Sequence, residues 1–168
     1  MPLLRLSKIL TVAAVALYAS LVAFGNLTDY GSNLAFVQHV LAMDSVFPDS
    51  TTRWRAITDP AVQHLAYALI IASETATALL CWFGAARLWR RRHAPANEFQ
   101  RAKSVAIGGL TLGFLVWQVG FMTIGGEWFG MWMSTLWNGL ETAFRCFMLI
   151  LVTLVFVAAR DEELPPRA

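Results

Sequence analysis

The stretch AVQHLAYALIIASETATALLCWFGAA, residues 61–86, decides the fold class of this chain. It is a long apolar run interrupted by a single acidic residue, Glu74, near its middle. A helix needs about 20 mainly apolar residues to cross the roughly 30 Å hydrocarbon core of a bilayer. Only helices and closed barrels satisfy their backbone hydrogen bonds in lipid, and a continuous run without alternation indicates a helix. Residues 61–86 are therefore predicted to form a transmembrane helix.

Three further runs of the same kind cover residues 9–25, 105–124 and 140–159. The chain is 57% hydrophobic and 14% charged, whereas soluble domains average about 45–50% and 25%. This composition excludes an ordinary soluble domain and a disordered chain, and a net charge of +2 is too small for nucleic-acid binding. The sequence predicts an all-α integral membrane protein, a four-helix transmembrane bundle that forms one domain over residues 1–168.

The distribution of basic residues predicts the orientation of this bundle. Arg5 and Lys8 precede the first run, and the connection 87–103 is rich in arginine. Because basic residues favour the cytoplasmic side, we expect both termini and this connection in the cytoplasm, with connections 26–60 and 125–139 outside. The first run continues through Phe24 without a clean small-x-small site, so we expect an uncleaved helix rather than a removed signal peptide.

The first outer connection, residues 26–60, is long enough to hold structure. Its apolar residues Leu34, Val37, Val40 and Leu41 recur at helical spacing. Two interpretations fit this spacing: a short amphipathic helix on the outer membrane surface, or a loop packed onto the bundle. Asp59 followed by Pro60 predicts the start of the second helix.

The second outer connection, residues 125–139, is rich in aromatic residues. Trp128, Phe129, Trp132 and Trp137 lie within a few residues of one another. Tryptophan settles at the membrane interface, so an aromatic belt explains this composition, and a surface for docking a partner protein is the alternative. Asn138 followed by Glu141 predicts a capping box at the start of the fourth helix.

A few polar residues fall inside the predicted spans, where burial of a charge is expensive and marks a candidate functional site. Glu74 is expected near the bilayer centre, as a structural acid bonded to another helix, as a carrier of protons or a cation, or as a contact for a ligand headgroup. Glu141 and Arg145 are four residues apart and are expected to pair. Counting along the spans places five residues in one layer of the outer half, and these are His64, Tyr67, Gln118, Glu141 and Arg145.

No known catalytic motif or metal-ligand spacing occurs in the sequence. His64 has no second histidine at matching depth, which argues against haem. No catalytic residue, metal or cofactor is therefore predicted, although a quinone or a lipid needs only an aromatic cleft and one or two polar donors. Gly109 and Gly113 form a small-xxx-small pair, which predicts close approach between helices.

Several short segments carry a family resemblance. They are RLSK at 5–8, FGNLTDYGSN at 24–33, FVQHVL at 36–41, WRAI at 54–57 and GGEWF at 125–129. With these segments the chain resembles a bacterial family of predicted small integral membrane proteins, typical of proteobacteria and catalogued as a domain of unknown function. The resemblance implies four spans in the bacterial inner (cytoplasmic) membrane and brings no catalytic residue with it.

The sequence favours a non-enzymatic accessory or interaction subunit of a membrane complex. Its partners would be the lipid bilayer and other membrane-protein subunits, with the outer connections as docking surfaces. One alternative is a quinone- or lipid-binding component of a respiratory complex that uses the outer polar layer. Another is a small transporter or proton channel centred on Glu74.

Overall fold

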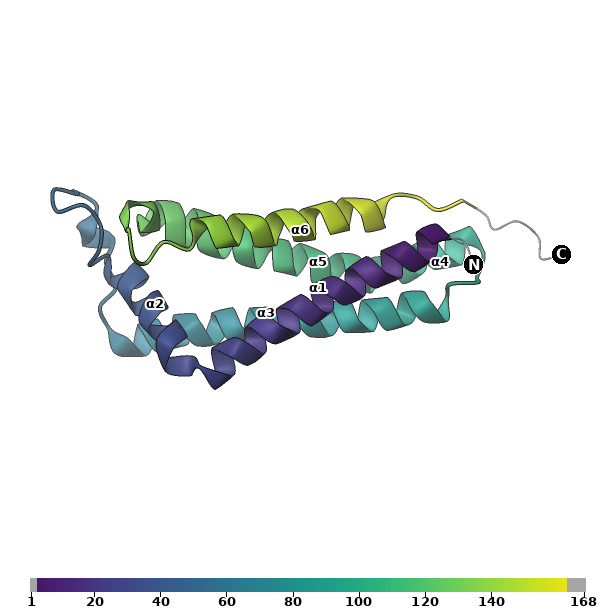
Figure 1. Cartoon of the computed structure of the whole chain (residues 1–168), viewed down its shortest axis with the longest axis horizontal. Coiled ribbons are helices and arrows are strands. Elements are labelled where there is room, and N and C mark those ends of the chain that lie inside the picture. The colour runs from purple at the N-terminus through teal and green to yellow at the C-terminus, as the bar shows by residue number, and fades with distance from the viewer. Residues whose placement is uncertain (1–2, 163–168) are drawn as a thin grey trace.

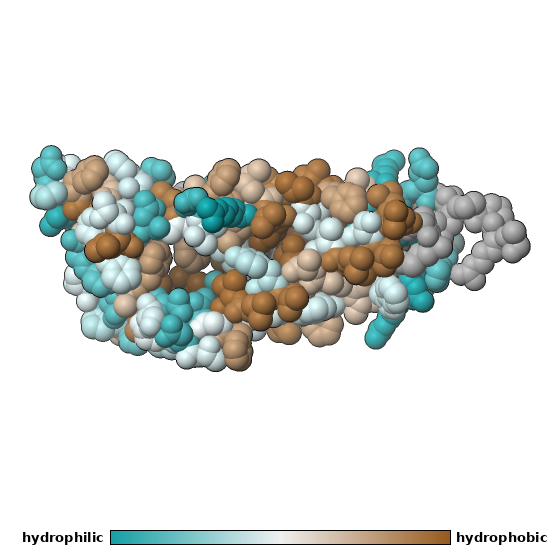
Figure 2. Space-filling view, viewed as in Figure 1, coloured by the Kyte–Doolittle hydropathy of each residue, from teal (hydrophilic) through white to brown (hydrophobic). Residues whose placement is uncertain are grey.

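The computed structural model describes residues 3–162 and shows a bundle of long helices with no β-strand in that range. Four helical segments are long and apolar enough to cross a membrane: Leu3–Thr28, Pro60–Arg90, Ala96–Trp128 and Leu140–Ala158. This confirms the predicted all-α transmembrane bundle. Hydrophilic side chains gather at the two ends of the molecule and mainly hydrophobic ones lie between them (Figure 2).

In chain order, the elements are α1 Leu3–Thr28, α2 Tyr30–Ala42, η1 Arg53–Arg55, α3 Pro60–Arg90, α4 Ala96–Ala102, α5 Ser104–Leu115, η2 Val116–Trp128, η3 Met131–Met133 and α6 Leu140–Ala158. Figure 1 shows how the elements are arranged, with α3 in contact with both α1 and α5 and with α6 packed on α5. η2 is a π-helix that continues α5, and η1 and η3 are single 3₁₀ turns. Residues 3 and 162 lie at the same end of the bundle, called here the termini end, and α2 lies at the opposite, α2 end.

The predicted first span was too short at both ends. Helix α1 begins at Leu3 and continues to Thr28, so Arg5 and Lys8 belong to the helix and are buried. The prediction was based on the uncharged run alone and therefore omitted the first and last turns of the helix. A helix continues past the hydrocarbon wherever its polar side chains find partners. Arg5 and Lys8, which were placed before the first span, are therefore part of its helix.

The first outer connection contains the short amphipathic helix that the spacing of its apolar residues predicts. The inner face of α2 buries Leu34, Val37, Val40 and Leu41 against α3 and the second outer connection. The helix ends at Met43, which adopts a left-handed conformation with φ 51°. The predicted start of α3 is also confirmed, since the Asp59 carboxylate accepts hydrogen bonds from the backbone of Ala61 and Val62 at 2.8 and 3.2 Å.

The backbones of helices α3 and α5 lie very close together, because glycines at the contact have no side chains to hold them apart. A Cβ on Gly109 would lie 2.9 Å from the backbone nitrogen of Cys81, and one on Gly113 would lie 2.8 Å from Cγ2 of Thr77. On the other helix, a Cβ on Gly84 would lie 2.6 Å from the Cα of Ala106. This confirms the close approach predicted from the Gly109–Gly113 spacing and extends it by one further glycine.

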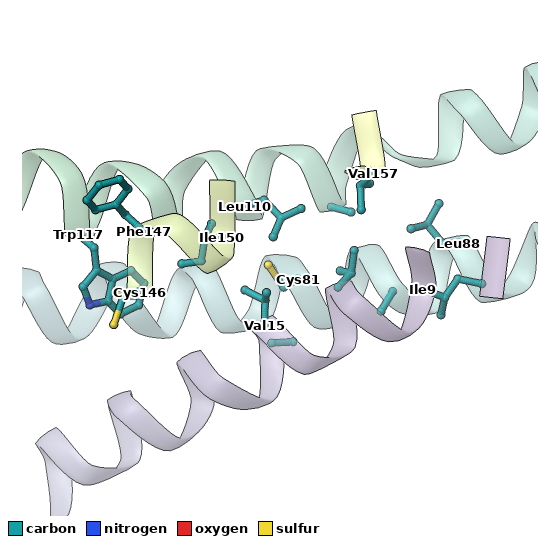
Figure 3. Close-up of a cluster of buried hydrophobic side chains, with 14 of the residues drawn as sticks. Ile9, Val15, Cys81, Leu88, Leu110, Trp117, Cys146, Phe147, Ile150 and Val157 are labelled. Atoms are coloured by element: carbon teal, nitrogen blue, oxygen red, sulfur yellow. The ribbon is translucent and has the colours of Figure 1, made fainter. Parts of the chain in front are cut away.

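A continuous apolar core surrounds this contact (Figure 3). It includes Cys81 and Leu88 from α3, Leu110 from α5 and Ile150 from α6, each nearly or wholly inaccessible to solvent. The two cysteines are free and buried within this core, where Cys81 serves as a small apolar residue.

Three basic side chains are buried at the termini end around one carboxylate. Arg5, Lys8 and Lys103 are each at most 1% exposed. Asp161 forms ion pairs with both lysines, at 3.1 Å from Lys8 Nζ. The backbone oxygen of Ala159 accepts from the same two ammonium groups, at 2.6 and 2.7 Å. The segment after α6 is thereby tied to α1 and to the start of α5.

Arg5 completes this end of the bundle by binding backbone oxygens. Its guanidinium donates to Ala94 at 2.6 Å and to Arg92 and Glu162 at 3.3 Å, and it lies 4.6 Å from the centre of the Phe99 ring. Burial of Arg5 therefore fixes the connection between α3 and α4 against α1.

Replacing Gly109 with leucine is expected to destabilise the bundle, because the new side chain collides with the backbone of α3. Overpacking costs about 1–3 kcal/mol, so the apparent Tm in detergent should fall by on the order of 5 °C. Gly108→Leu is the matched control, since a Cβ there meets nothing within 4 Å. Equal Tm values for the two variants would contradict the close contact.

Asp161→Asn is expected to lower the apparent Tm by roughly 10 °C, because two buried lysines lose their shared counter-charge. Glu162→Gln, a neighbouring exposed carboxylate, should leave the Tm within about 2 °C of the parent protein. Thermal unfolding of both variants in the same detergent measures the difference. A Tm for Asp161→Asn as high as that of the control would show that the charge cluster contributes nothing.

Candidate functional site

Glu74 is the most deeply placed acid of the membrane-spanning part and bonds to a neighbouring helix. Its side chain lies on the inner face of α3 and is 1% exposed. The side-chain amide of Asn26, on α1, donates to Glu74 Oε2 at 2.7 Å. Tyr67, two turns before Glu74 on α3, donates its hydroxyl to the backbone oxygen of Asn26 at 2.9 Å. These three residues, called here the Glu74 bridge, join α1 to α3.

The Glu74 bridge contains no cationic side chain. Within residues 3–162, Glu74 has no ion pair, and its hydrogen-bond partner is the neutral Asn26. In the same range no group of three His, Cys, Asp or Glu side chains is arranged to hold a metal ion. The arrangement matches an acid that fixes helix packing, which is the first of the roles expected for Glu74.

The polar residues that depth counting places in one layer of the outer half do not form one cluster between the helices. His64 is exposed and bonds through Nδ1 to the Tyr30 hydroxyl at 2.9 Å. Gln118 is half-buried on η2. Of the outer layer, only Tyr67 joins Glu74, through Asn26. Sequence gives the depth of a residue along its helix but not the direction in which its side chain faces, so these directions could not be predicted.

Glu141 and Arg145 form the predicted pair but face away from the bundle. Their carboxylate and guanidinium are bonded to each other, and the two side chains are 80% and 67% exposed. The pair therefore does not contact Glu74. Asn138 accepts a hydrogen bond from the backbone of Leu140 at 3.1 Å. Glu141 turns to Arg145 instead of bonding back, so the predicted capping box does not close.

The aromatic residues of the second outer connection divide into two groups. Phe129 is buried, and the Trp137 ring stacks on His39 at 4.3 Å, so these two residues hold α2 against the bundle. Trp128 and Trp132 are each 48% exposed. Of the predicted docking residues, these two remain accessible.

Trp128 also belongs to an exposed aromatic cluster with the first outer connection. Its ring meets Trp54 edge to face at 6.0 Å, and the Arg55 guanidinium lies 4.5 Å from its centre. Trp132 contacts Phe47 in the same manner at 5.7 Å. The two outer connections thus form one joint surface at the α2 end.

Sequence reasoning missed Asn26 and Tyr18. Asn26 seemed to begin a connection, but Ala16, Ala19 and Ala23 form a buried stripe that Asn26 continues at helical spacing. That periodicity was the signal for its inward position. Tyr18 belongs to α1, and its hydroxyl is 2.7 Å from Sγ of Cys146 on α6. No pattern in the sequence indicates this contact.

The model of one protein family, described as predicted small integral membrane protein (DUF2165), matches residues 4–160. The chain belongs to this family. No curated protein and no solved structure matches it. Membership in DUF2165 confirms the expected resemblance and the integral membrane character of the protein. The function of DUF2165 is unknown, so membership assigns no role to the Glu74 bridge.

A double-mutant cycle tests the Glu74 bridge. Asn26→Ala and Glu74→Leu are each expected to destabilise the protein, and the combined variant should be more stable than the sum predicts by about 0.6–1.7 kcal/mol. Glu74→Gln keeps an acceptor for Asn26 and should resemble the parent protein. Unfolding in mixed detergent micelles measures these differences, and strict additivity of the two substitutions would refute the bridge.

Proposed function

We propose that this protein is a non-enzymatic accessory subunit of a membrane complex and that it contacts its partner through the exposed face of α6. One observation carries the proposal: the Glu141–Arg145 pair points away from its own bundle on a membrane-spanning helix. Charged side chains in such helices are rare and usually face a bundle interior or a water-filled cavity. Here the two members bond to each other on the outer side of their own bundle.

The position of the pair supports a protein contact. Arg145 is the sixth residue of α6, about 7–8 Å along the helix from its first residue at 1.5 Å per residue. Within the described chain, Arg145 bonds only to Glu141, which leaves further guanidinium donors for a second molecule. A polar group on a neighbouring transmembrane helix would satisfy those donors.

The rest of this face is apolar and exposed. Phe144, Leu149, Val152 and Val155 are 49%, 65%, 62% and 64% exposed. Figure 2 shows a hydrophilic patch over the start of α6 and mainly hydrophobic or weakly polar side chains along the remainder. An apolar helix face with one polar contact is typical of an interface between membrane proteins.

Exposed side chains of the second outer connection lie close to the start of α6 along the chain. The connection that carries the exposed Trp132 leads directly into α6, and Leu136 within it is 82% exposed. A partner seated on the start of α6 would therefore lie near Trp132 and Leu136, which agrees with the docking role expected for Trp132. The bonding of Glu74 to Asn26 favours this role over a channel, because a side-chain amide is a poor carrier of protons.

Photo-crosslinking in the native membrane tests the proposal. Benzoylphenylalanine in place of Val152 is expected to give one defined adduct with another membrane protein. The same probe in place of Phe83, which is 66% exposed on α3, should give none. The double substitution Glu141→Leu with Arg145→Leu should leave the fold intact and reduce the Val152 adduct at least tenfold.

Three outcomes would overturn the accessory role. They are equal adducts at both positions, an adduct of twice the protein's own mass, and an adduct that does not respond to loss of the ion pair. The first would indicate random contact in the lipid, the second self-association, and the third an interface elsewhere.

A further inference from the structure

An apolar groove of 490 Å³ lies between α2, α3 and η2. Its walls include Phe36 and Val40 from α2, Leu69 and Ile70 from α3, and Val119 and Ile124 from η2. Its size falls within the range of about 300–1,000 Å³ that is usual for ligand sites. Neither the Glu74 bridge nor the exposed face of α6 includes this groove.

The groove begins where the glycine contact between α3 and α5 ends. Gly113 meets Thr77 at the last close approach of the two helices. Its neighbour Leu112 and Ser73, which lies one turn from Thr77 toward the α2 end, already line the groove. From there toward the α2 end, side chains no longer fill the gap between α3 and η2, and α2 closes its far end. The groove is thus a consequence of how the two helices diverge.

The wall on the η2 side is a π-helix, which widens the backbone at this point. Its register is shown by the hydrogen bond from Phe129 N to Ile124 O at 3.0 Å, five residues back, and by the contact of Thr123 Oγ1 with Gln118 O at 3.1 Å. π-Helical turns are rare, usually last a single turn, and are frequent at functional sites. Here thirteen residues, Val116–Trp128, adopt this form, and six of them line the groove.

We propose that this groove holds one hydrocarbon chain of a bilayer lipid. The rim residues Leu69, Leu115 and Ile124 are 60%, 45% and 46% exposed on membrane-spanning helices, so the groove opens onto hydrocarbon. Among its lining residues, Ser73 has the only polar side chain, and its hydroxyl already donates to Leu69 O at 2.7 Å. The walls therefore recognise a chain by shape and offer nothing to a polar headgroup.

The same features argue against other occupants. A helix with its side chains is 10–12 Å wide, so the groove has room for only about one turn of a partner helix. A quinone ring requires hydrogen-bond donors for its carbonyl oxygens, and the one hydroxyl in the wall is already bonded. Water is disfavoured, because a buried water needs two to four polar partners.

Gly120→Leu provides the test, because Gly120 lines the groove and a Cβ there meets nothing within 4 Å. The leucine is expected to occupy the groove without disturbing the backbone. Gly108→Leu is the matched control: it lies on the same long helix, is equally open and does not line the groove. Ala66→Leu, on the α3 wall, is a second blocking variant, and thermal unfolding confirms that each variant is folded.

Native mass spectrometry with dioleoyl-phosphatidylglycerol and dioleoyl-phosphatidylcholine measures retention of lipid after removal of detergent. The parent protein and Gly108→Leu are expected to retain one lipid of either kind, and Gly120→Leu and Ala66→Leu should lower its occupancy at least tenfold. Equal retention by all four proteins, or no retention by the parent, would overturn the proposal. A strong preference for one headgroup, or displacement of lipid by an equimolar long-chain quinone, would also overturn it.

Discussion

The close contact between α3 and α5 is the constraint on which the rest of the structure depends. Without side chains at Gly84, Gly109 and Gly113, the two backbones meet directly, which is how helices gain packing energy in a solvent as apolar as their own side chains. Because this contact is confined to the part of the bundle nearer the termini, the helices separate beyond it. The groove and the site where α2 packs both lie in that separation.

The polar side chains in the middle of α3 are satisfied within the protein. The hydroxyls of Ser73, Thr75 and Thr77 donate to backbone oxygens four residues earlier at 2.7–2.8 Å, and Glu74 between them bonds to α1. Lipid offers no substitute for such bonds, so each polar group needs a partner within the protein. The Glu141–Arg145 pair differs in its direction, because its two members bond to each other while facing away from the bundle.

Sequence predicted the features that depend on spacing along one helix. The four spans, the Asp59 cap, the Gly109–Gly113 contact and the pairing of Glu141 with Arg145 all follow from local patterns. Sequence did not predict features that depend on how helices are rotated or on residues far apart in the chain. Burial of Lys8 needs Lys103 and Asp161, and the outward direction of Arg145 needs the whole bundle. The π-helical register of η2 has no local signal.

The two ends of α6 are held very differently, and this difference bears on how a partner would bind. At the termini end, the oxygen of Ala159 and the carboxylate of Asp161 fix the residues after α6 to Lys8 and Lys103. At the other end, no ion pair within residues 3–162 holds the start of α6 to another helix, and its contacts include the hydrogen bond from Leu140 N to Asn138 Oδ1 and the apolar packing of Leu140. If the proposed accessory role holds, the segment that carries Glu141 and Arg145 lies at the end of α6 without ionic anchors, where a helix adjusts most easily to a second membrane protein.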